Sequence, residues 1–294
     1  MPQIHPTAVV DPRAELAEGV VVGPYVIIEG HVTVGPDTRI LPHCVLSGRT
    51  EIGARCKIGP AAYVGLDPQH GAYDGSETWL VVGDDVTVRE NSSIHRAMRP
   101  GREHATTIGN KVFLMATSHV GHDAKVGDGA TLANGTMLGG HSEVGARAFL
   151  GGGSGLHQFV RVGRIAIIRG NEPVTHDVPP FAAMAYGGLK GYNAVGCKRA
   201  GISPAGIASI RRAYHCIHQN RSLPTAVAQI RDTVPETPEV LELLDFIAHT
   251  RRGLPASVRF FRSGAFAPVA PDESAADGQG LLQGQAAAAT RWRE

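Results

Sequence analysis

The stretch Leu114-Met-Ala-Thr-Ser-His-Val-Gly-His-Asp-Ala-Lys-Val-Gly-Asp-Gly-Ala-Thr-Leu132 carries an aliphatic residue at every sixth position. The same spacing extends in both directions along the chain, and every residue in phase is Ile, Leu or Val. A period of six fits neither an amphipathic helix nor an alternating strand, so it is an internal repeat. The phased positions are 4, 10, 16, 22, 28, 34, 40, 46, 52, 58, 64, 82, 88, 94, 108, 114, 120, 126, 132, 138, 144, 150, 156, 162, 168 and 174.

Small residues accompany each aliphatic one and indicate how the repeat folds. Glycine often follows directly, as at Gly121 and Gly127, and a small or β-branched residue stands four places on, as at Ala124 and Ala130. We interpret each repeat as a short strand and a sharp turn, with glycine supplying the positive φ of the turn. Three successive repeats would make one triangular coil, with aliphatic side chains inside and coils about 4.8 Å apart.

Two segments break the phase, and the repeat then ends. Residues 65–81 and 96–107 are predicted to be loops that leave the prism, and we expect the first to contact ligand. The prism is predicted to span residues 1–180. A helical domain is predicted over 181–262, with Ser203 as an N-cap before Pro204 and further helices near Pro224 and Pro238. Residues 263–294, rich in Gly, Ala, Ser and Gln, are predicted to be a disordered tail.

The composition excludes several classes of protein. With 28 basic and 27 acidic residues the net charge is only +1, which gives no reason to expect binding to nucleic acid or to an anionic membrane. The four cysteines form no CxxC pair and are too few for a secreted disulfide scaffold. No run approaches the roughly 18 apolar residues of a membrane span. These features predict a soluble, cytoplasmic protein.

Four histidines and a carboxylate stand out among the small residues of the repeat. Stacking of successive coils predicts that His122, His141 and Gln158 form a ladder on one flank, with His157 beside it. A neutral imidazole at His122 would act as a general base, and Asp123 would orient it. The backbone N–H groups of Gly139 and Gly140 would receive an oxyanion one coil above. This set suits acyl transfer from a thioester without a covalent enzyme intermediate, since no Cys or Ser is placed as a nucleophile.

The chain resembles the UDP-N-acetylglucosamine O-acyltransferase family within the hexapeptide-repeat acyltransferases. The resemblance spans about residues 1 to 255 and implies a left-handed parallel β-helix followed by a small α-helical domain. It further implies a homotrimer with sites between neighbouring prisms, and transfer of a (3-hydroxy)acyl chain to a UDP-amino sugar as the first step of lipid A synthesis. The donor would be an acyl carrier protein thioester, and no cofactor or metal is implied. The motifs that carry it are Ile4-His-Pro-Thr-Ala-Val-Val10, Ser93-Ile-His-Arg96, His119-Val-Gly-His-Asp123, Leu132-Ala-Asn134, Gly139-Gly-His141, His157-Gln-Phe159, Asp177-Val-Pro-Pro-Phe181 and Asn193-Ala-Val-Gly-Cys-Lys-Arg199.

The resemblance also implies roles for individual residues. His122 would be the base, Asp123 its partner and Gly140 the oxyanion donor. Asn193 and Arg199 would approach the nucleotide, and Gly170 would bound the acyl chain. Contacts to the sugar and the thioester would come from His119, His141, His157 and Gln158, with His70 at the loop position that faces the substrate.

Departures from the family pattern keep other interpretations open. The family carries Asp and Lys where this chain has His70 and Ala72, and a second arginine where it has Ala200. The chain could therefore be a diverged paralogue that acylates another nucleotide sugar, or a silent binding scaffold. A third alternative is a metalloenzyme like the γ-class carbonic anhydrases, with His119 and His122 joined by a histidine of a neighbouring subunit.

Overall fold

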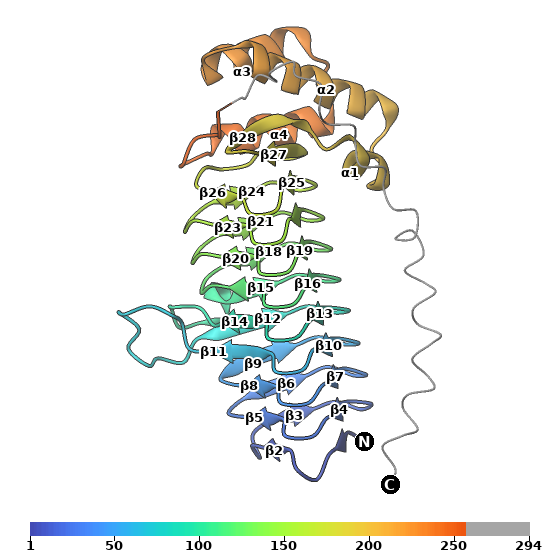
Figure 1. The fold of residues 1–294 in the computed structure, drawn as a ribbon, viewed down its shortest axis with the longest axis vertical. Coiled ribbons are helices and arrows are strands. Elements are labelled where there is room, and N and C mark those ends of the chain that lie inside the picture. The colour runs from blue at the N-terminus through green and yellow to red at the C-terminus, as the bar shows by residue number, and fades with distance from the viewer. Residues whose placement is uncertain (257–294) are drawn as a thin grey trace. The chain divides into compact units, whose positions relative to one another are not determined.

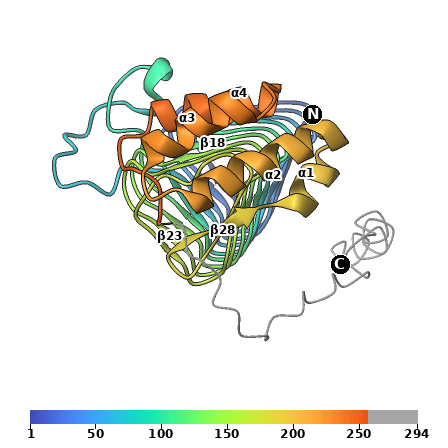
Figure 2. The ribbon, with the colours of Figure 1, turned by 90° about the horizontal axis from the view of Figure 1, so that it is seen from above.

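The computed structural model describes residues 1–256, and these form a three-sided prism closed at one end by helices (Figure 1). Viewed from above, the strands stack along the three sides of a triangle (Figure 2). The fold is the left-handed parallel β-helix that the family resemblance implies, followed by a few helices. The predicted disordered tail, 263–294, and the last residues of the predicted helical domain lie outside the described residues.

Three sheets, named A, B and C here, make the sides of the prism. Sheet A contains β1 (Gln3–Ile4), β4 (Val21–Val22), β7 (Arg39–Ile40), β10 (Lys57–Ile58), β13 (Thr87–Val88), β16 (Phe113–Leu114), β19 (Thr131–Leu132), β22 (Phe149–Leu150), β25 (Ile167–Ile168), β27 (Ala182–Ala185) and β28 (Gly188–Tyr192). Sheet B contains β2 (Val9–Val10), β5 (Ile27–Ile28), β8 (Val45–Leu46), β11 (Tyr63–Leu66), β14 (Ser93–His95), β17 (His119–Val120), β20 (Met137–Leu138), β23 (Gly155–Leu156) and β26 (Pro173–Val174). Sheet C contains β3 (Glu15–Leu16), β6 (Val32–Val34), β9 (Arg49–Ile52), β12 (Trp79–Val82), β15 (Thr106–Ile108), β18 (Lys125–Val126), β21 (Glu143–Val144) and β24 (Arg161–Val162).

The aliphatic residues of the repeat form the core of the prism. In the regular section one coil takes three repeats, so that Leu114 pairs with Leu132 and Leu132 with Leu150. All phased residues from Val22 to Val174 are buried, whereas Ile4 is exposed because no coil lies beneath the first one. The predicted small residues are buried as well, including Ala124.

The glycines that follow the aliphatic residues have a different purpose from the one predicted. The left-handed backbone conformation falls on the third residue after the aliphatic one, for example Asp123 with φ 59°. Gly121 does not adopt it; a Cβ there would lie 2.7 Å from the carbonyl oxygen of Leu138 in the next coil. The repeat therefore selects glycine at this position because adjacent coils approach closely, not because φ is positive.

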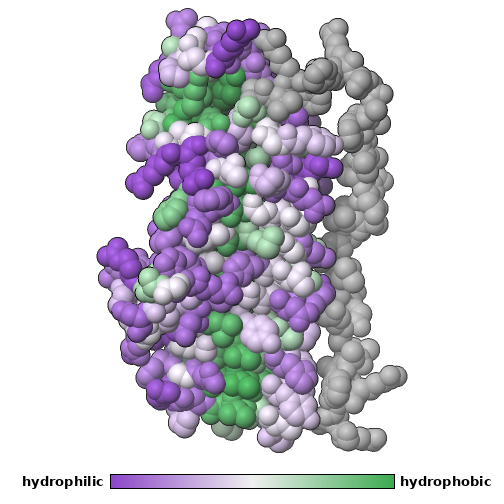
Figure 3. Space-filling view, turned by 60° about the vertical axis from the view of Figure 1, so that its left-hand side comes forward, coloured by the Kyte–Doolittle hydropathy of each residue, from purple (hydrophilic) through white to green (hydrophobic). Residues whose placement is uncertain are grey.

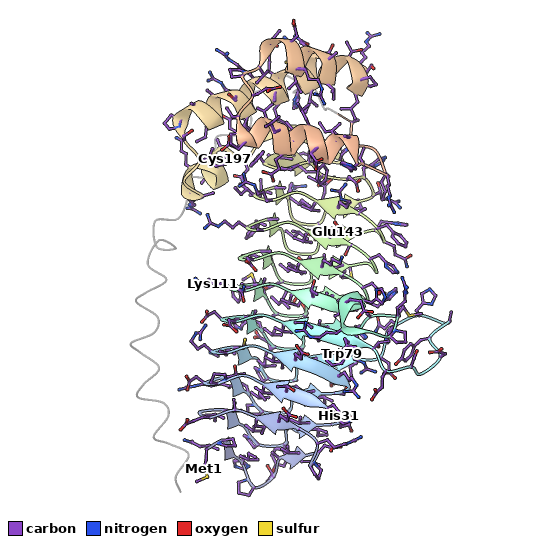
Figure 4. All side chains as sticks on the ribbon, turned by 180° about the vertical axis from the view of Figure 1, so that it is seen from behind. Met1, His31, Trp79, Lys111, Glu143 and Cys197 are labelled. Atoms are coloured by element: carbon purple, nitrogen blue, oxygen red, sulfur yellow. The ribbon has the colours of Figure 1, made fainter. Side chains whose placement is uncertain are left out.

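Both interruptions of the phase leave the prism at the corner between sheets B and C. The first loop joins β11 to β12 and projects sideways, with Trp79 at its root (Figures 1 and 4). The second joins β14 to β15 and contains a short 3-10 helix, η1 (Arg102–His104). Both are shorter than predicted because β11, β12 and β15 extend into the ranges 65–81 and 96–107, where they keep pairing with adjacent coils.

The segment after residue 180, predicted to be helical, begins with strands. β27 continues sheet A by pairing in parallel with β25, and β28 turns back antiparallel to it. This hairpin covers the open end of the core with buried Met184 and Leu189. The helices that follow are α1 (Ala194–Arg199), α2 (Pro204–Gln219), α3 (Leu223–Thr233) and α4 (Pro238–Ala248). Ser203 caps α2 as predicted, accepting a hydrogen bond from the Gly206 N–H. No helix in residues 1–256 is long and apolar enough to span a membrane.

Candidate active site

His122 and Asp123 lie at the corner between sheets B and C, directly above the two loops. They connect β17 to β18, one coil beyond the connection that forms the second loop and two beyond the first. The positive φ of Asp123 turns the chain at this corner, and aspartate tolerates that conformation better than most residues. Three successive coils thus bring both loops and the predicted base to one place.

The two side chains form a hydrogen-bonded dyad. His122 Nδ1 lies 2.6 Å from Asp123 Oδ2, and both side chains are nearly buried. A carboxylate only accepts hydrogen bonds, so the proton is on Nδ1 and the Nε2 lone pair of His122 is free to take another. The backbone N–H of Met98, in the second loop, donates to the same carboxylate at 3.2 Å, and the Asp123 N–H donates to Thr106 Oγ1 at 2.8 Å. Asp123 is therefore held from three directions.

Gly140 stands one coil above His122 and touches its ring. A Cβ on Gly140 would lie 2.6 Å from Nε2 and Cε1 of His122, so only glycine admits the imidazole here. The Gly139 N–H, predicted to be a second oxyanion donor, instead donates to the Leu156 carbonyl. Among the described residues the Gly140 N–H has no acceptor, so it is a free backbone donor beside the base.

The residues that stack in successive coils differ from the predicted ladder of His122, His141 and Gln158. His141 stands one full coil after Asp123 and shares its left-handed conformation, as does Phe159 one coil further on. The His141 ring stacks on Phe159 with centroids 4.5 Å apart and meets the edge of His122 at 5.2 Å. Its Nε2 is 3.6 Å from Asp123 Oδ2, and burial is the main cause that lowers the pKa of His141.

The first loop places His70 against the opposite side of the base. The His70 and His122 rings meet edge to face with centroids 5.4 Å apart. His70 Nδ1 accepts the Ala72 N–H at 3.1 Å, so the neutral ring carries its proton on Nε2. The loop expected to contact ligand therefore presents a hydrogen-bond donor next to the dyad.

His119 belongs to a second group of imidazoles, on sheet B. Its Nδ1 is 2.9 Å from Ser93 Oγ, and its ring centroid is 5.2 Å from that of His95. Burial lowers the pKa of His119 to about 4, so the ring is neutral at physiological pH. Ser93 and His95 occur in a motif quoted above, but no role was predicted for them. The second loop lengthens the coil between Ser93 and His119, so a fixed step of three repeats misses their pairing.

A groove of about 470 Å³ runs from the dyad along sheet B. His157 and Gln158 lie exposed at its upper part, and Gln69 of the first loop, which sequence reasoning missed, lines its lower part. The groove is lined by Gln69, His119, Gly121, His122, Met137, Leu138, Gly139, Gly140, Gly155, Leu156, His157, Gln158, Pro173, Val174 and Thr175. It combines polar donors around His122 with a run of small and apolar residues.

The remaining predicted site residues lie at the other two corners. Gly170 is at the corner between sheets A and B, where a Cβ would lie 3.0 Å from the Gly152 carbonyl oxygen. Asn193 and the exposed Arg199 line a separate hollow beside Arg147, near the corner between sheets C and A. Asn193 caps α1, since its Oδ1 accepts from the Gly196 N–H and its Nδ2 donates to the Ile165 carbonyl. One chain alone does not bring these residues to His122.

The structure gives no support to the predicted metal pair of His119 and His122. Within residues 1–256 one group of three side chains has metal-ligand spacing, His122, Asp123 and His141, and His119 is not part of it. Two members of that group are already bonded to each other through the Nδ1 proton.

Two family models and several known proteins match this chain. Residues 177–255 match the family described as "Udp N-acetylglucosamine O-acyltransferase; Domain 2", and residues 105–140 match the bacterial transferase hexapeptide family. The chain is 40% identical over 258 residues to the acyl-[acyl-carrier-protein]--UDP-N-acetylglucosamine O-acyltransferase of Thermodesulfovibrio yellowstonii, covering 86% of this chain and 99% of that protein. It is 41% identical over 254 residues to the enzyme of the same name from Anaeromyxobacter, covering 85% and 98%.

Solved structures show the same likeness in three dimensions. The crystal structure of UDP-N-acetylglucosamine O-acyltransferase from Moraxella catarrhalis superposes with a TM-score of 0.81 at 32% identity, covering 86% of this chain and 99% of that one. These matches favour neither the metalloenzyme nor the silent scaffold. The chain belongs to the UDP-N-acetylglucosamine O-acyltransferase family of hexapeptide-repeat enzymes.

Proposed function

We propose that the protein transfers a (3-hydroxy)acyl chain from an acyl carrier protein thioester to the 3-hydroxyl of UDP-N-acetylglucosamine, the first step of lipid A synthesis. The observation that carries this is the His122 and Asp123 dyad, whose free Nε2 lies beside the free N–H of Gly140. A base and an oxyanion donor side by side are what acyl transfer to a hydroxyl requires.

The positions of these atoms support the following reaction. His122 Nε2 takes the proton of the acceptor hydroxyl, whose oxygen attacks the thioester carbon. The Gly140 N–H donates to the oxyanion of the tetrahedral intermediate, and Asp123 stabilises the imidazolium. Collapse of the intermediate breaks the carbon–sulfur bond, and His122 returns its proton to the thiolate of the carrier. Every proton is accounted for by one imidazole, and the donor thioester is the only activated group needed.

The neighbouring side chains would bind the substrates. His70, with its proton on Nε2, would donate to a sugar oxygen. Burial lowers the pKa of His141 and of His119, which favours their neutral forms, so they add hydrogen-bonding capacity without favouring a charge that would oppose protonation of His122. His157 and Gln158 would contact the sugar and the pantetheine at the upper part of the groove, because both side chains are exposed there.

We infer that the working form is a homotrimer in the cytoplasm. Gly170 and Arg199 lie at different corners from His122, so a neighbouring copy is needed to bring them to the same substrate. The outer face of the first coils of sheet B is hydrophobic, with exposed Val9, Ile27 and Tyr63 (Figure 3). Apolar surface of this kind supports contact between copies. Arg199 would then meet the phosphates of a nucleotide bound at the active site of a neighbouring copy, and Gly170 would leave room for the acyl chain.

The test is an assay of the purified protein with UDP-N-acetylglucosamine and 3-hydroxyacyl thioesters of acyl carrier protein, read by mass spectrometry. We expect one acyl chain added through an ester and release of the free carrier thiol. The His122→Ala variant should remain an assembled protein with turnover at least 10²-fold lower. Turnover by this variant within a few-fold of the unaltered protein would remove His122 from the mechanism.

The acceptor is tested in the same assay. His70 and Ala72 replace the charged pair of the family pattern, and His70 packs directly on the base. A panel of UDP-amino sugars, including one with an amine at position 3, therefore accompanies UDP-N-acetylglucosamine. Preference for another acceptor by 10-fold or more in kcat/KM would replace the acceptor in this proposal and leave the chemistry of His122 in place.

A further inference from the structure

The first loop reaches the active site but has few contacts of its own. Most of residues 67–78 are exposed, with only Pro68 and Thr78 buried. Gln69 and His70 nevertheless border the groove at His122. An exposed loop with little packing samples many conformations, so something must hold these two residues in place.

The contacts that hold the loop converge on the buried side chain of Arg96. Its guanidinium donates to the Gly65 carbonyl, where the loop begins, and to the Asp67 carboxylate. It also lies 3.4 Å from the hydroxyl of Tyr73, in the middle of the loop. Only 7% of Arg96 is exposed. One planar, rigid group thus ties together three points of the loop.

The preceding residue reinforces this attachment. His95 Nδ1 donates to the carbonyl oxygen of Asp67 at 2.6 Å, and the His95 ring packs against His119. The prism also leaves space for the arginine: Gly48 has a φ of 67°, and a Cβ there would collide with the Arg96 guanidinium. Gly48 in one coil and His95 in another therefore both help to place the Arg96 side chain and the loop that it holds.

We infer that Arg96 is the positioning residue that fixes the first loop and thereby sets His70 beside His122 for recognition of the acceptor. Arg96 touches no reacting atom; it acts through the loop. The inference rests on the proposed function for its kinetic consequence, but the position of the loop can be measured without any turnover.

The dyad has its own attachment, which separates acceptor binding from the proton transfer. The Ala97 N–H donates to the Trp79 carbonyl at 3.1 Å, and the Met98 N–H donates to Asp123. Both donors are backbone N–H groups and neither bond involves the Arg96 side chain, so a change in that side chain leaves them in place. Loss of the Arg96 contacts should therefore weaken binding of the acceptor more than it slows the chemical step.

The test replaces Arg96 by lysine, which keeps the charge but cannot reach Gly65, Asp67 and Tyr73 together. We expect Arg96→Lys to raise the acceptor KM at least 10-fold, with kcat within threefold and the thioester KM within twofold of the unaltered enzyme. Asp67→Asn changes the loop side of the same contact at an exposed residue and should shift the acceptor KM in the same direction by a smaller factor. It also provides the answer if Arg96→Lys does not fold. The matched control is Arg55→Lys, whose arginine pairs with Asp85 on another corner.

Hydrogen exchange supplies the measurement that needs no activity. The hydrogen-bonded amides of the loop, those of His70, Ala72, Tyr73 and Ser76, should exchange at least 10-fold faster in Arg96→Lys and Asp67→Asn, while those of β17 and β20 stay unchanged. An unchanged acceptor KM, a fall in kcat alone, or equal effects from Arg55→Lys would each overturn the inference. If the unaltered protein shows no turnover, the proposed function fails. Hydrogen exchange of the loop amides then decides by itself whether Arg96 holds the first loop in place.

Discussion

His122 and Gly140 are in van der Waals contact across two adjacent coils, with a Cβ on Gly140 placed 2.6 Å from the base nitrogen. The φ of Gly140 is not positive, so alanine would suit the backbone and only the imidazole stands in the way. We therefore expect Gly140→Ala to displace the ring and lower kcat at least 10²-fold with a small change in thermal stability. Steady-state kinetics and a melting curve measure both. Gly71→Ala is the control, because a Cβ there meets nothing within 4 Å. Full activity of the Gly140→Ala enzyme would contradict the claim that a side chain at this position displaces the His122 ring.

Asp123 accepts the Nδ1 proton of His122, so its charge should matter more than its shape. Asparagine tolerates the left-handed conformation that Asp123 adopts, and Asp123→Asn should keep the corner intact. Without the carboxylate the imidazolium loses its stabilising partner and the tautomer is no longer fixed. We expect kcat to fall by about 10² to 10⁴-fold. Activity measured across pH, together with a crystal structure of the variant, would show whether the loss is electrostatic.

The separation of His122 from Arg199 on one chain predicts complementation between subunits. His122→Ala and Arg199→Ala proteins should each be nearly inactive, since each removes one contribution from every site. Co-expressed with different affinity tags, the mixed trimers should recover activity. If the residues meet across an interface, random mixing leaves about one site in four with both groups intact. Absence of any recovery in mixed trimers would contradict a site shared between copies.

The close approach of coils at the glycines predicts a stability effect far from the chemistry. A Cβ on Gly127 would lie 2.6 Å from the backbone nitrogen of Ala146, at the corner between sheets C and A. Gly127→Ala should destabilise the fold by about 1 to 3 kcal/mol, because the backbone of the next coil must shift. Denaturant unfolding measures the difference. Gly71→Ala, in open space, should be close to neutral by the same measurement.

Burial of His119 predicts that the fold weakens in acid. Its pKa is lowered to about 4, whereas a histidine in the unfolded chain titrates near 6.5. As the pH falls from about 6.5 to about 4, His119 binds a proton in the unfolded state but stays neutral in the folded state. The free energy of unfolding therefore falls over this window. His119→Asn removes this titration. The melting temperature of the variant should therefore fall less between pH 7 and pH 5 than that of the unaltered protein. Part of the pH dependence will remain, because burial also lowers the pKa of His95.

The sequence was enough for the prism and for the dyad. A six-residue period admits few folds, and an aliphatic core with small residues at the corners followed from it directly. His122 and Asp123 are adjacent in the chain, so their pairing at a corner needed no long-range information. The same reasoning misjudged the hairpin at 182–192, since its pairing with β25 depends on the open end of the core and not on any local period.

Tertiary structure alone decided which groups surround the base. Loop insertions shift the register by amounts that no fixed step predicts, so the approach of His70 to His122 and of Ser93 to His119 appears only in three dimensions. The same holds for Gly140, whose need for glycine comes from a ring in the coil below. The repeat sets what each coil looks like because it is a local pattern; the loops set what the site looks like because their ends are fixed by buried contacts such as those of Arg96.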